Sequence, residues 1–212
     1  MLYFVKTPKI LKRLFANLTW DVSTNEKEIY LTFDDGPTPE ITKWVLDRLS
    51  EYNAKATFFC IGKNVAKHPE IAQNIIAHGH SIGNHTQNHT NCWKVSKSTY
   101  LNDVEEAQEI INSKVLNQES INLFRPPYGK ITSKRAKQLH KRGYKIIMWD
   151  VLSADFDQRI NPEKCLQNVL KNTQKGSIVV FHDSIKAQKN LTYTLPKVLE
   201  HFSKKGYSFK AI

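Results

Sequence analysis

The chain has 212 residues, of which 40% are hydrophobic and 24% are charged, so it is ordinary globular material with enough length for one sizeable core. The 31 basic and 20 acidic residues give a formal net charge of +11. This charge is compatible with a nucleic acid, an anionic membrane surface or an acidic polymer as partner. Because the lysines are dispersed without interleaved aromatic residues, we interpret most of them as solvated and expect no nucleic-acid partner.

The cysteines and the N-terminus bear on the compartment. Three cysteines, at positions 60, 92 and 165, are odd in number and widely separated, so we expect buried thiols and no disulfide framework. No segment approaches the roughly 18 consecutive apolar residues of a membrane span. Met1 to Val5 is a short apolar stretch without the cleavage site of a secretory signal. We therefore expect a protein that is cytoplasmic or peripheral at the membrane, with noncanonical export left open.

The first predicted element is a basic amphipathic helix from Pro8 to Leu18. Lysine and arginine side chains lie opposite an apolar stripe at helical spacing, formed by Ile10, Leu11, Leu14, Phe15 and Leu18. The stripe is expected either to pack on the domain or to bring residues 8–18 to an anionic membrane surface. We assign residues 1–24 to an N-terminal segment packed on or beside a single domain of residues 25–212.

Strands and helices alternate through the rest of the chain. Strands are predicted over residues 28–33, 54–61, 122–124, 144–151, 177–181 and 207–211. Helices are predicted over residues 39–52, 68–79, 98–115, 132–142, 162–173 and 193–204, with Thr38 as the N-cap and Pro39 as the first helical residue of the first of these. Several strands are apolar on both faces, which predicts an α/β fold with a parallel sheet closed or nearly closed into a barrel.

Two adjacent aspartates, Asp34 and Asp35, end the first apolar strand, and His85 and His89 follow about 50 residues later. A catalytic zinc takes carboxylate oxygen and imidazole nitrogen, and it keeps three protein ligands so that a water or substrate oxygen can bind. One Asp and both His would supply these ligands and leave the other Asp for proton transfer. An Asp-Gly turn and two surface histidines are the structural alternatives. Haloacid-dehalogenase-type phosphatases are disfavoured, because they need one residue between the two aspartates.

Three further motifs follow predicted strands. In Phe124-Arg125-Pro126-Pro127-Tyr128-Gly129, two prolines would present Arg125 and the Tyr128 amide in fixed geometry. The other two motifs are Trp149-Asp150-Val151-Leu152-Ser153-Ala154-Asp155-Phe156 and Ile178-Val179-Val180-Phe181-His182-Asp183. A surface arginine and a core histidine are their ordinary structural interpretations. The ends of barrel strands are, however, where catalytic groups gather.

In this order the motifs D-D-G, H-T-x-x-H, R-P-P-Y, D-F and V-x-H resemble those of the polysaccharide deacetylases of the NodB-homology group, carbohydrate esterase family 4. The resemblance covers nearly all of residues 28–212. It implies a single-domain distorted (β/α) barrel of the NodB type with about seven parallel strands. It also implies a Zn²⁺ ion, or Co²⁺ or another divalent transition metal, bound by Asp35, His85 and His89.

The resemblance also implies residue roles. Asp34 would be the general base, oriented by Arg125, and His182 would be the general acid, oriented and charged by Asp155. The backbone N–H of Tyr128 would face the oxyanion, and substrate contacts would come from Pro127, Tyr128, Phe156 and Val180. The chain departs from the family pattern by carrying Phe156 in place of Trp and Val180 in place of Leu. These departures concern the fit of the acyl group and the sugar.

The implied activity is hydrolysis of a linear amide by a zinc-activated water. It would remove N-acetyl groups from N-acetylglucosamine-type residues of an oligo- or polysaccharide, such as a chitooligosaccharide or peptidoglycan. An O-acetyl sugar esterase of the acetyl-xylan type on the same site and a catalytically silent carbohydrate-binding relative are the alternatives.

Overall fold

The computed structural model describes residues 3–116 and 122–212, so Met1 and Leu2 of the predicted N-terminal segment lie outside the described residues. In chain order, its elements are α1 (Lys9–Leu14), β1 (Glu28–Asp34), α2 (Ile41–Ser50), β2 (Ala56–Cys60), α3 (Gly62–Lys67), α4 (Pro69–Ala77), β3 (Ser81–Asn84), α5 (Lys97–Ile111), the π-helix η1 (Asn112–Leu116), β4 (Leu123–Phe124), the 3₁₀ helix η2 (Pro127–Gly129), α6 (Ser133–Lys141), β5 (Lys145–Ile146), β6 (Val151–Leu152), α7 (Pro162–Asn172), β7 (Ile178–His182), α8 (Gln188–Lys204) and β8 (Ser208–Phe209).

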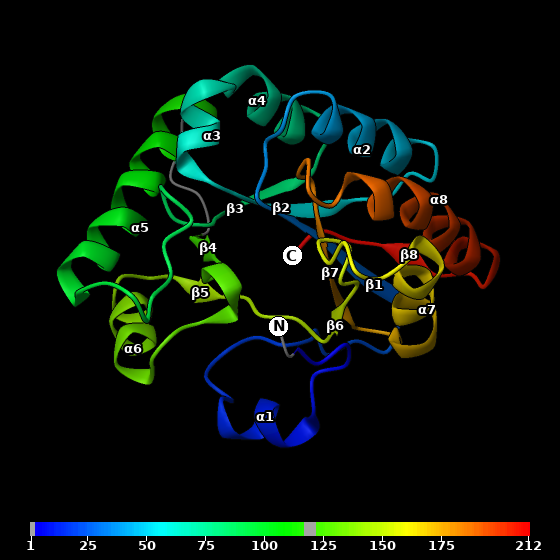
Figure 1. Cartoon of the computed structure of the whole chain (residues 1–212), viewed down its shortest axis with the longest axis horizontal. Coiled ribbons are helices and arrows are strands. Elements are labelled where there is room, and N and C mark those ends of the chain that lie inside the picture. Colours follow the sequence, from blue (N-terminus) through cyan, green and yellow to red (C-terminus); the bar gives the residue numbers. More distant parts are fainter. Residues whose placement is uncertain (1–2, 117–121) are drawn as a thin grey trace.

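The strands form one parallel sheet in the order β5-β4-β3-β2-β1-β7-β6. The short strand β8 pairs with the start of β1, at Glu28 and Ile29. The sheet curls into a half-barrel that the helices surround, and its end strands β5 and β6 are not paired with each other in the described part of the chain (Figure 1). The prediction of a single α/β domain with about seven parallel strands in a distorted barrel is confirmed.

Strand β1 shows how the sequence positions polar groups inside this sheet. Side chains alternate along a strand, so residues two apart share a face. Ile29, Leu31 and Phe33 belong to the main core beneath the helices, where Phe33 stacks between Phe58 and Phe181. The intervening residues Thr32 and Asp34 are buried on the other face. The apolar face thus anchors the strand, while the inner face delivers polar groups to the barrel interior.

The N-terminal segment runs along the opening between β5 and β6. The N–H of Thr7 donates to the carbonyl of Asp150 at 2.9 Å, and the N–H of Leu152 donates to that of Val5 at 2.8 Å. Farther along, the N–H of Thr19 donates to Ile146 at 2.9 Å. These bonds occupy backbone groups that an open sheet would leave unpaired.

One predicted strand needs correction, and one strand and one helix were not predicted. The predicted strand over residues 144–151 is two short strands, β5 and β6, because the intervening residues leave the ladder. The N–H of Met148 instead donates to the carbonyl of Thr19 at 2.7 Å. Strand β3 and helix α3 were not predicted, since Ser81-Ile82-Gly83-Asn84 contains a single large apolar residue.

Helix starts also differ from prediction. Helix α2 begins at Ile41, because Glu40 has a φ of 65° and interrupts any helix begun at Pro39. Helix α8 begins at Gln188, before the predicted residue 193. All three cysteines are free and buried, as expected. Within the described residues, none of the helices combines the length and the apolar character that a membrane crossing requires.

Helix α1 is shorter than predicted, and its apolar stripe does not pack on the domain. No residue of α1 is buried. Ile10 is 61% exposed and Leu14 is 68% exposed, whereas Leu18, after the helix, is buried. The helix is held beside the sheet through Lys12, which pairs with the buried carboxylate of Asp150. Its apolar side therefore faces outward.

Candidate active site

A cavity of about 440 Å³ opens at the carboxyl ends of the strands. Both Asp34 and His182 end their strands, and they are direct partners in the β1–β7 register. Asn84 ends β3, so that His85 follows at the same edge of the sheet. The cavity is lined by Tyr3, Asp34, Asp35, His85, His89, Pro126, Tyr128, Gly129, Lys130, Trp149, Leu152, Phe156, Val180, His182 and Lys186.

Asp35, His85 and His89 form a cluster that suits a metal ion. One ligand atom from each residue lies within 4.8 Å of the others. The Oδ1 atom of Asp35 is 3.2 Å from Nε2 of His89 and 3.7 Å from Nε2 of His85. This oxygen is buried without a hydrogen-bond partner in the described residues. Because an unpaired buried carboxylate oxygen is costly, it indicates a place for a cation.

The two histidines present the ring nitrogen that a metal needs. Nδ1 of His85 is 2.7 Å from the backbone carbonyl of Arg125, which only a protonated Nδ1 can satisfy. Nδ1 of His89 is 3.1 Å from the Tyr128 hydroxyl. Both Nε2 atoms face Asp35. At His85 the carbonyl partner of Nδ1 fixes the tautomer that leaves Nε2 free to bind a metal, as outer partners of metal ligands do. His85 and His89 lie on a loop after β3, and not on a helix.

Burial and charge set the ionisation of these ligands. Burial lowers the pKa of His85 to about 4, which keeps its imidazole neutral and able to coordinate near neutral pH. Burial by itself raises the pKa of Asp35, but the positive charge of nearby protonated imidazole, that of His182 foremost, lowers it. Asp35 is therefore held as a carboxylate.

Asp34 is fixed by a fully buried arginine. Nη1 of Arg125 donates to Oδ1 of Asp34 at 2.6 Å and to the Thr32 hydroxyl at 2.7 Å. Its Nε and Nη2 donate to the carbonyls of Ile147 and Met148. The other oxygen of Asp34 has no hydrogen bond among the described residues, and Asp34 lines the cavity. This carboxylate is thus oriented on one side and available for a proton on the other.

His182 lines the same cavity as the Asp35, His85 and His89 cluster and is paired with Asp155. Nδ1 of His182 is 2.8 Å from Oδ1 of Asp155, whose other oxygen accepts the His182 backbone N–H at 2.7 Å. Burial alone lowers the pKa of an imidazole, but the charge of Asp155 and its hydrogen bond raise the pKa of His182 to about 9. A protonated His182 can donate through Nε2.

The model of the polysaccharide deacetylase family matches residues 21–147, which is more than half of the chain. The chain belongs to the polysaccharide deacetylase family. It is 37% identical over 197 residues to a peptidoglycan-N-acetylglucosamine deacetylase of Bacillus cereus, covering 92% of this chain and 91% of that protein. It is also 33% identical over 163 residues to a chitooligosaccharide deacetylase of Azorhizobium caulinodans, covering 76% of each.

The family assignment extends to three dimensions. A crystal structure of the Bc1960 peptidoglycan N-acetylglucosamine deacetylase, in complex with an N-oxidanyl-benzamide compound, matches with a TM-score of 0.88. The match has 32% sequence identity and covers 97% of this chain and 95% of that one. The resemblance drawn from the motifs is therefore confirmed, and the half-barrel is the fold of a polysaccharide deacetylase.

In this member of the deacetylase family, the predicted substrate-contacting residues occupy different positions relative to the cavity. Tyr128, Phe156 and Val180 line it, whereas Pro127 is buried and Pro126 lines it instead. Tyr128 has a φ of 61°, a left-handed conformation that turns the chain after the two prolines. Substrate contacts for all four residues stay predictions.

Phe156 and Val180, the two departures from the family pattern, both line the cavity. The ring of Phe156 is 5.0 Å from that of His182, measured between centroids, so it forms a wall beside the proposed acid. Val180 is paired with Leu152 across β6 and β7, and both line the cavity. The two side chains therefore lie side by side in the wall of the cavity.

Several lining residues were missed by the sequence reasoning. Tyr3 donates to Asp157 and packs edge-on against Phe156, so the N-terminal segment contributes to the cavity wall. Trp149 stands at the start of a quoted motif, which was an available signal. Lys130 and Lys186 follow motifs by a few residues but carry no pattern of their own.

Proposed function

We propose that the chain is a metal-dependent hydrolase that removes N-acetyl groups from N-acetylglucosamine-type residues of an oligo- or polysaccharide, chitooligosaccharide or peptidoglycan-like. One observation carries the proposal: the metal-ligand cluster, with its orphaned Asp35 oxygen, shares a single cavity with Asp34 and His182. The names of the relatives support an acetylated glucosamine as the substrate.

A metal fits the residues present. Asp35, His85 and His89 would hold Zn²⁺, or Co²⁺ or another divalent transition metal, since two imidazoles and one carboxylate are ligands that these ions accept. When bound, such an ion supplies Lewis-acid polarisation of the amide carbonyl and a lowered pKa for a coordinated water.

Side chains of this protein would carry out the proton transfers of amide hydrolysis. Asp34 takes a proton from the attacking water, while Arg125 fixes the carboxylate in position. The water oxygen bonds to the acetyl carbon, and the developing oxyanion faces the backbone N–H of Tyr128. His182 donates its proton to the departing nitrogen as the carbon–nitrogen bond breaks, and acetate and a free amine are left.

Acetate release tests this function. Purified protein would be assayed on N-acetylglucosamine oligomers, peptidoglycan fragments and O-acetylated xylan, with added zinc and with a chelator. We expect acetate from the first two substrates, loss with chelator and recovery with zinc. Acetate release that is insensitive to chelation would contradict the metal role. Release from xylan alone would favour the O-acetyl esterase, and glycan binding without release would favour a catalytically silent relative.

We also propose that the protein is peripheral at a membrane, through α1. The exposed Ile10 and Leu14 are one turn apart, and the exposed Lys9 and Arg13 have the same spacing. An apolar strip beside cations is complementary to the acyl and headgroup region of an anionic bilayer.

Point variants suit the membrane test better than deletion, because Tyr3 lines the cavity and residues 5–7 bond to the sheet. Co-sedimentation with phosphatidylglycerol vesicles should fall in the double variant Ile10→Gln/Leu14→Gln. It should be retained in Ile185→Gln, which alters an exposed isoleucine elsewhere. Equal sedimentation of the parent, the double variant and Ile185→Gln would contradict the proposal.

A further inference from the structure

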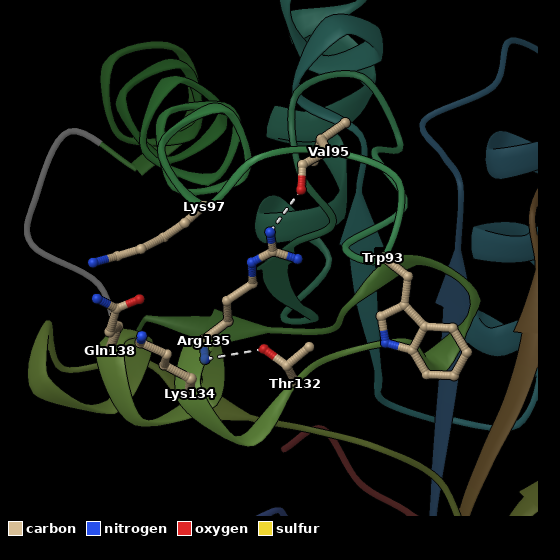
Figure 2. A pocket seen from close by; sticks show the side chains of 7 residues that line it. All are labelled: Trp93, Val95, Lys97, Thr132, Lys134, Arg135 and Gln138. Atoms are coloured by element: carbon tan, nitrogen blue, oxygen red, sulfur yellow. Dashed lines mark hydrogen bonds between the residues drawn. The ribbon is translucent and has the colours of Figure 1, made fainter.

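A second hollow of about 550 Å³ lies between helix α6 and the loop that follows His89 (Figure 2). Trp93 forms one of its walls, and the indole is 65% exposed. Large aromatic side chains are usually buried over most of their surface, and their exposure in a hollow is typical of a binding surface.

The loop that carries Trp93 is held firmly although the indole is exposed. The guanidinium of Arg135 donates to the backbone carbonyl of Cys92, before Trp93, and to that of Val95, after it. Figure 2 shows the bond to Val95. The same guanidinium lies over the Tyr100 ring, 5.5 Å from its centroid. The chain therefore presents a fixed aromatic platform, and a ligand would lose little affinity to loop ordering.

Lys130 connects this platform with the catalytic cavity. Lys130 lines the cavity, and its Nζ lies 4.9 Å from the centroid of the Trp93 ring. Across residues 3–116 and 122–212, Lys130 takes part in no ion pair. The ammonium group covers one face of the indole, so a glycan chain leaving the cavity on this side would meet Lys130 together with the exposed remainder of the Trp93 ring.

The charge around the two hollows favours an anionic ligand. Among the lining residues described, the acids of the catalytic cavity are Asp34 and Asp35, and both already have a cation or metal role. The described lining of the hollow beside Trp93 adds three basic residues, Lys97, Lys134 and Arg135, and no acid. A surface of one sign raises the local concentration of ligands of the opposite sign.

We propose that Trp93 and Lys130 form an additional substrate subsite that takes a carboxylate-bearing glycan. This inference rests on the proposed function. Trp93 stacks, through the indole face that Lys130 does not cover, on the apolar face of the sugar ring next to the acetylated one. Lys130 pairs with a carboxylate on that ring. A neutral chitooligosaccharide gains the stacking alone, so the subsite distinguishes acidic from neutral glycans.

The test compares two tetrasaccharides of equal length. One is the neutral N-acetylglucosamine tetramer, and in the other alternate rings carry a lactyl ether carboxylate, as in a peptidoglycan strand without peptides. KM and kcat for acetate release would be measured for the parent, Trp93→Ala and Lys130→Gln. Tyr193→Ala is the matched control, because Tyr193 is an exposed aromatic residue with Lys197 over its ring on α8, away from the cavity lining.

We expect Trp93→Ala to raise KM for both tetrasaccharides on the order of tenfold, with kcat nearly unchanged. Lys130→Gln should raise KM for the carboxylate-bearing tetrasaccharide alone, and Tyr193→Ala should match the parent. An unchanged KM in Trp93→Ala, or an equal rise for both glycans in Lys130→Gln, overturns the proposal.

A parent that releases no acetate from either glycan would defeat the proposed function and not the subsite. In that case, calorimetric titration of the same two tetrasaccharides would decide. Weaker binding of the carboxylate-bearing glycan by Lys130→Gln than by the parent supports the subsite, and equal binding overturns it.

Discussion

The imidazole of His182 stays protonated against the effect of its own burial. Its contact with Asp155 at 2.8 Å outweighs desolvation and raises the pKa of His182 to about 9. A general acid acts only while it is protonated, so His182 can serve up to that pH. The alkaline limit of activity should therefore report the Asp155–His182 pair.

Asp155→Asn tests this pair. Loss of the carboxylate removes the charge that raises the pKa of His182, so the alkaline limb of the pH–rate profile should move to lower pH. The maximal rate should also fall by about 10²–10⁴, the usual contribution of a positioned acid. Asp157→Asn is a control, because Asp157 bonds Tyr3 and Arg159 and not His182. An unmoved alkaline limb in Asp155→Asn would contradict the assignment.

At the scale of elements, Arg125 ties the site to several parts of the sheet. It follows β4, bonds Asp34 and Thr32 of β1, and bonds the carbonyls of the segment between β5 and β6. Its guanidinium also lies 4.1 Å from the centroid of the Phe59 ring on β2. One buried cation thus holds the proposed base and joins strands that are distant in the sequence.

Arg125→Met would leave the carboxylate of Asp34 buried without its partner. Removing one member of a buried pair typically costs about 3–5 kcal/mol, so the free energy of unfolding in urea should fall by that amount and activity should be lost. Arg142→Met removes an exposed pair with Glu105 and should cost about 0–1 kcal/mol. Equal stability losses in the two variants would refute the linking role.

The elements that could be predicted from sequence are those whose patterns reflect local burial. Strands β1, β2 and β7 are rich in buried apolar residues, and β1 and β7 end at Asp34 and His182. Strand β3 could not be predicted, because it is a strand through its pairing with β2 and β4 and has little apolar pattern. The break between β5 and β6 likewise depends on the distant residue Thr19.

At the scale of the whole molecule, the N-terminal segment and the sheet are one unit. Asp150 is buried in the sheet opening, where Lys6 and Lys12 of the N-terminal segment and Ser177 bond its carboxylate. Burial alone raises the pKa of Asp150, but the hydrogen bonds from Lys12 and Lys6 lower it below its usual 3.8. The contribution of these bonds is therefore fully present above that pH and is lost as pH falls through the lowered value.

The double variant Lys6→Met/Lys12→Met should lower the free energy of unfolding by about 1–3 kcal/mol near neutral pH, since bonds to a charged group are lost. The difference from the parent should shrink below pH 3.8, where Asp150 becomes protonated in the unfolded chain. Urea unfolding at several pH values measures both effects. A difference that grows as the pH falls would contradict this role.

The packing of the N-terminal segment on the sheet also explains why some residues that line the cavity could not be predicted from the sequence. The proposed metal ligands, acid and base belong to motifs that follow strands, and these motifs can be read from the sequence. Tyr3 enters the cavity because the N-terminal segment crosses the opening of the half-barrel. The proposed role of Lys130 depends on its contact with Trp93, which lies on another loop. Such neighbours depend on how whole segments pack together.

The proposed function gives two adjacent aspartates different tasks: Asp35 would bind the metal and Asp34 would move the proton. The most direct measurement is zinc titration by calorimetry together with acetate release, on the parent and on the matched variants Asp34→Asn and Asp35→Asn. We predict that Asp34→Asn binds zinc like the parent and releases no acetate, while Asp35→Asn loses both. Acetate release by Asp34→Asn at the parent rate would contradict the account.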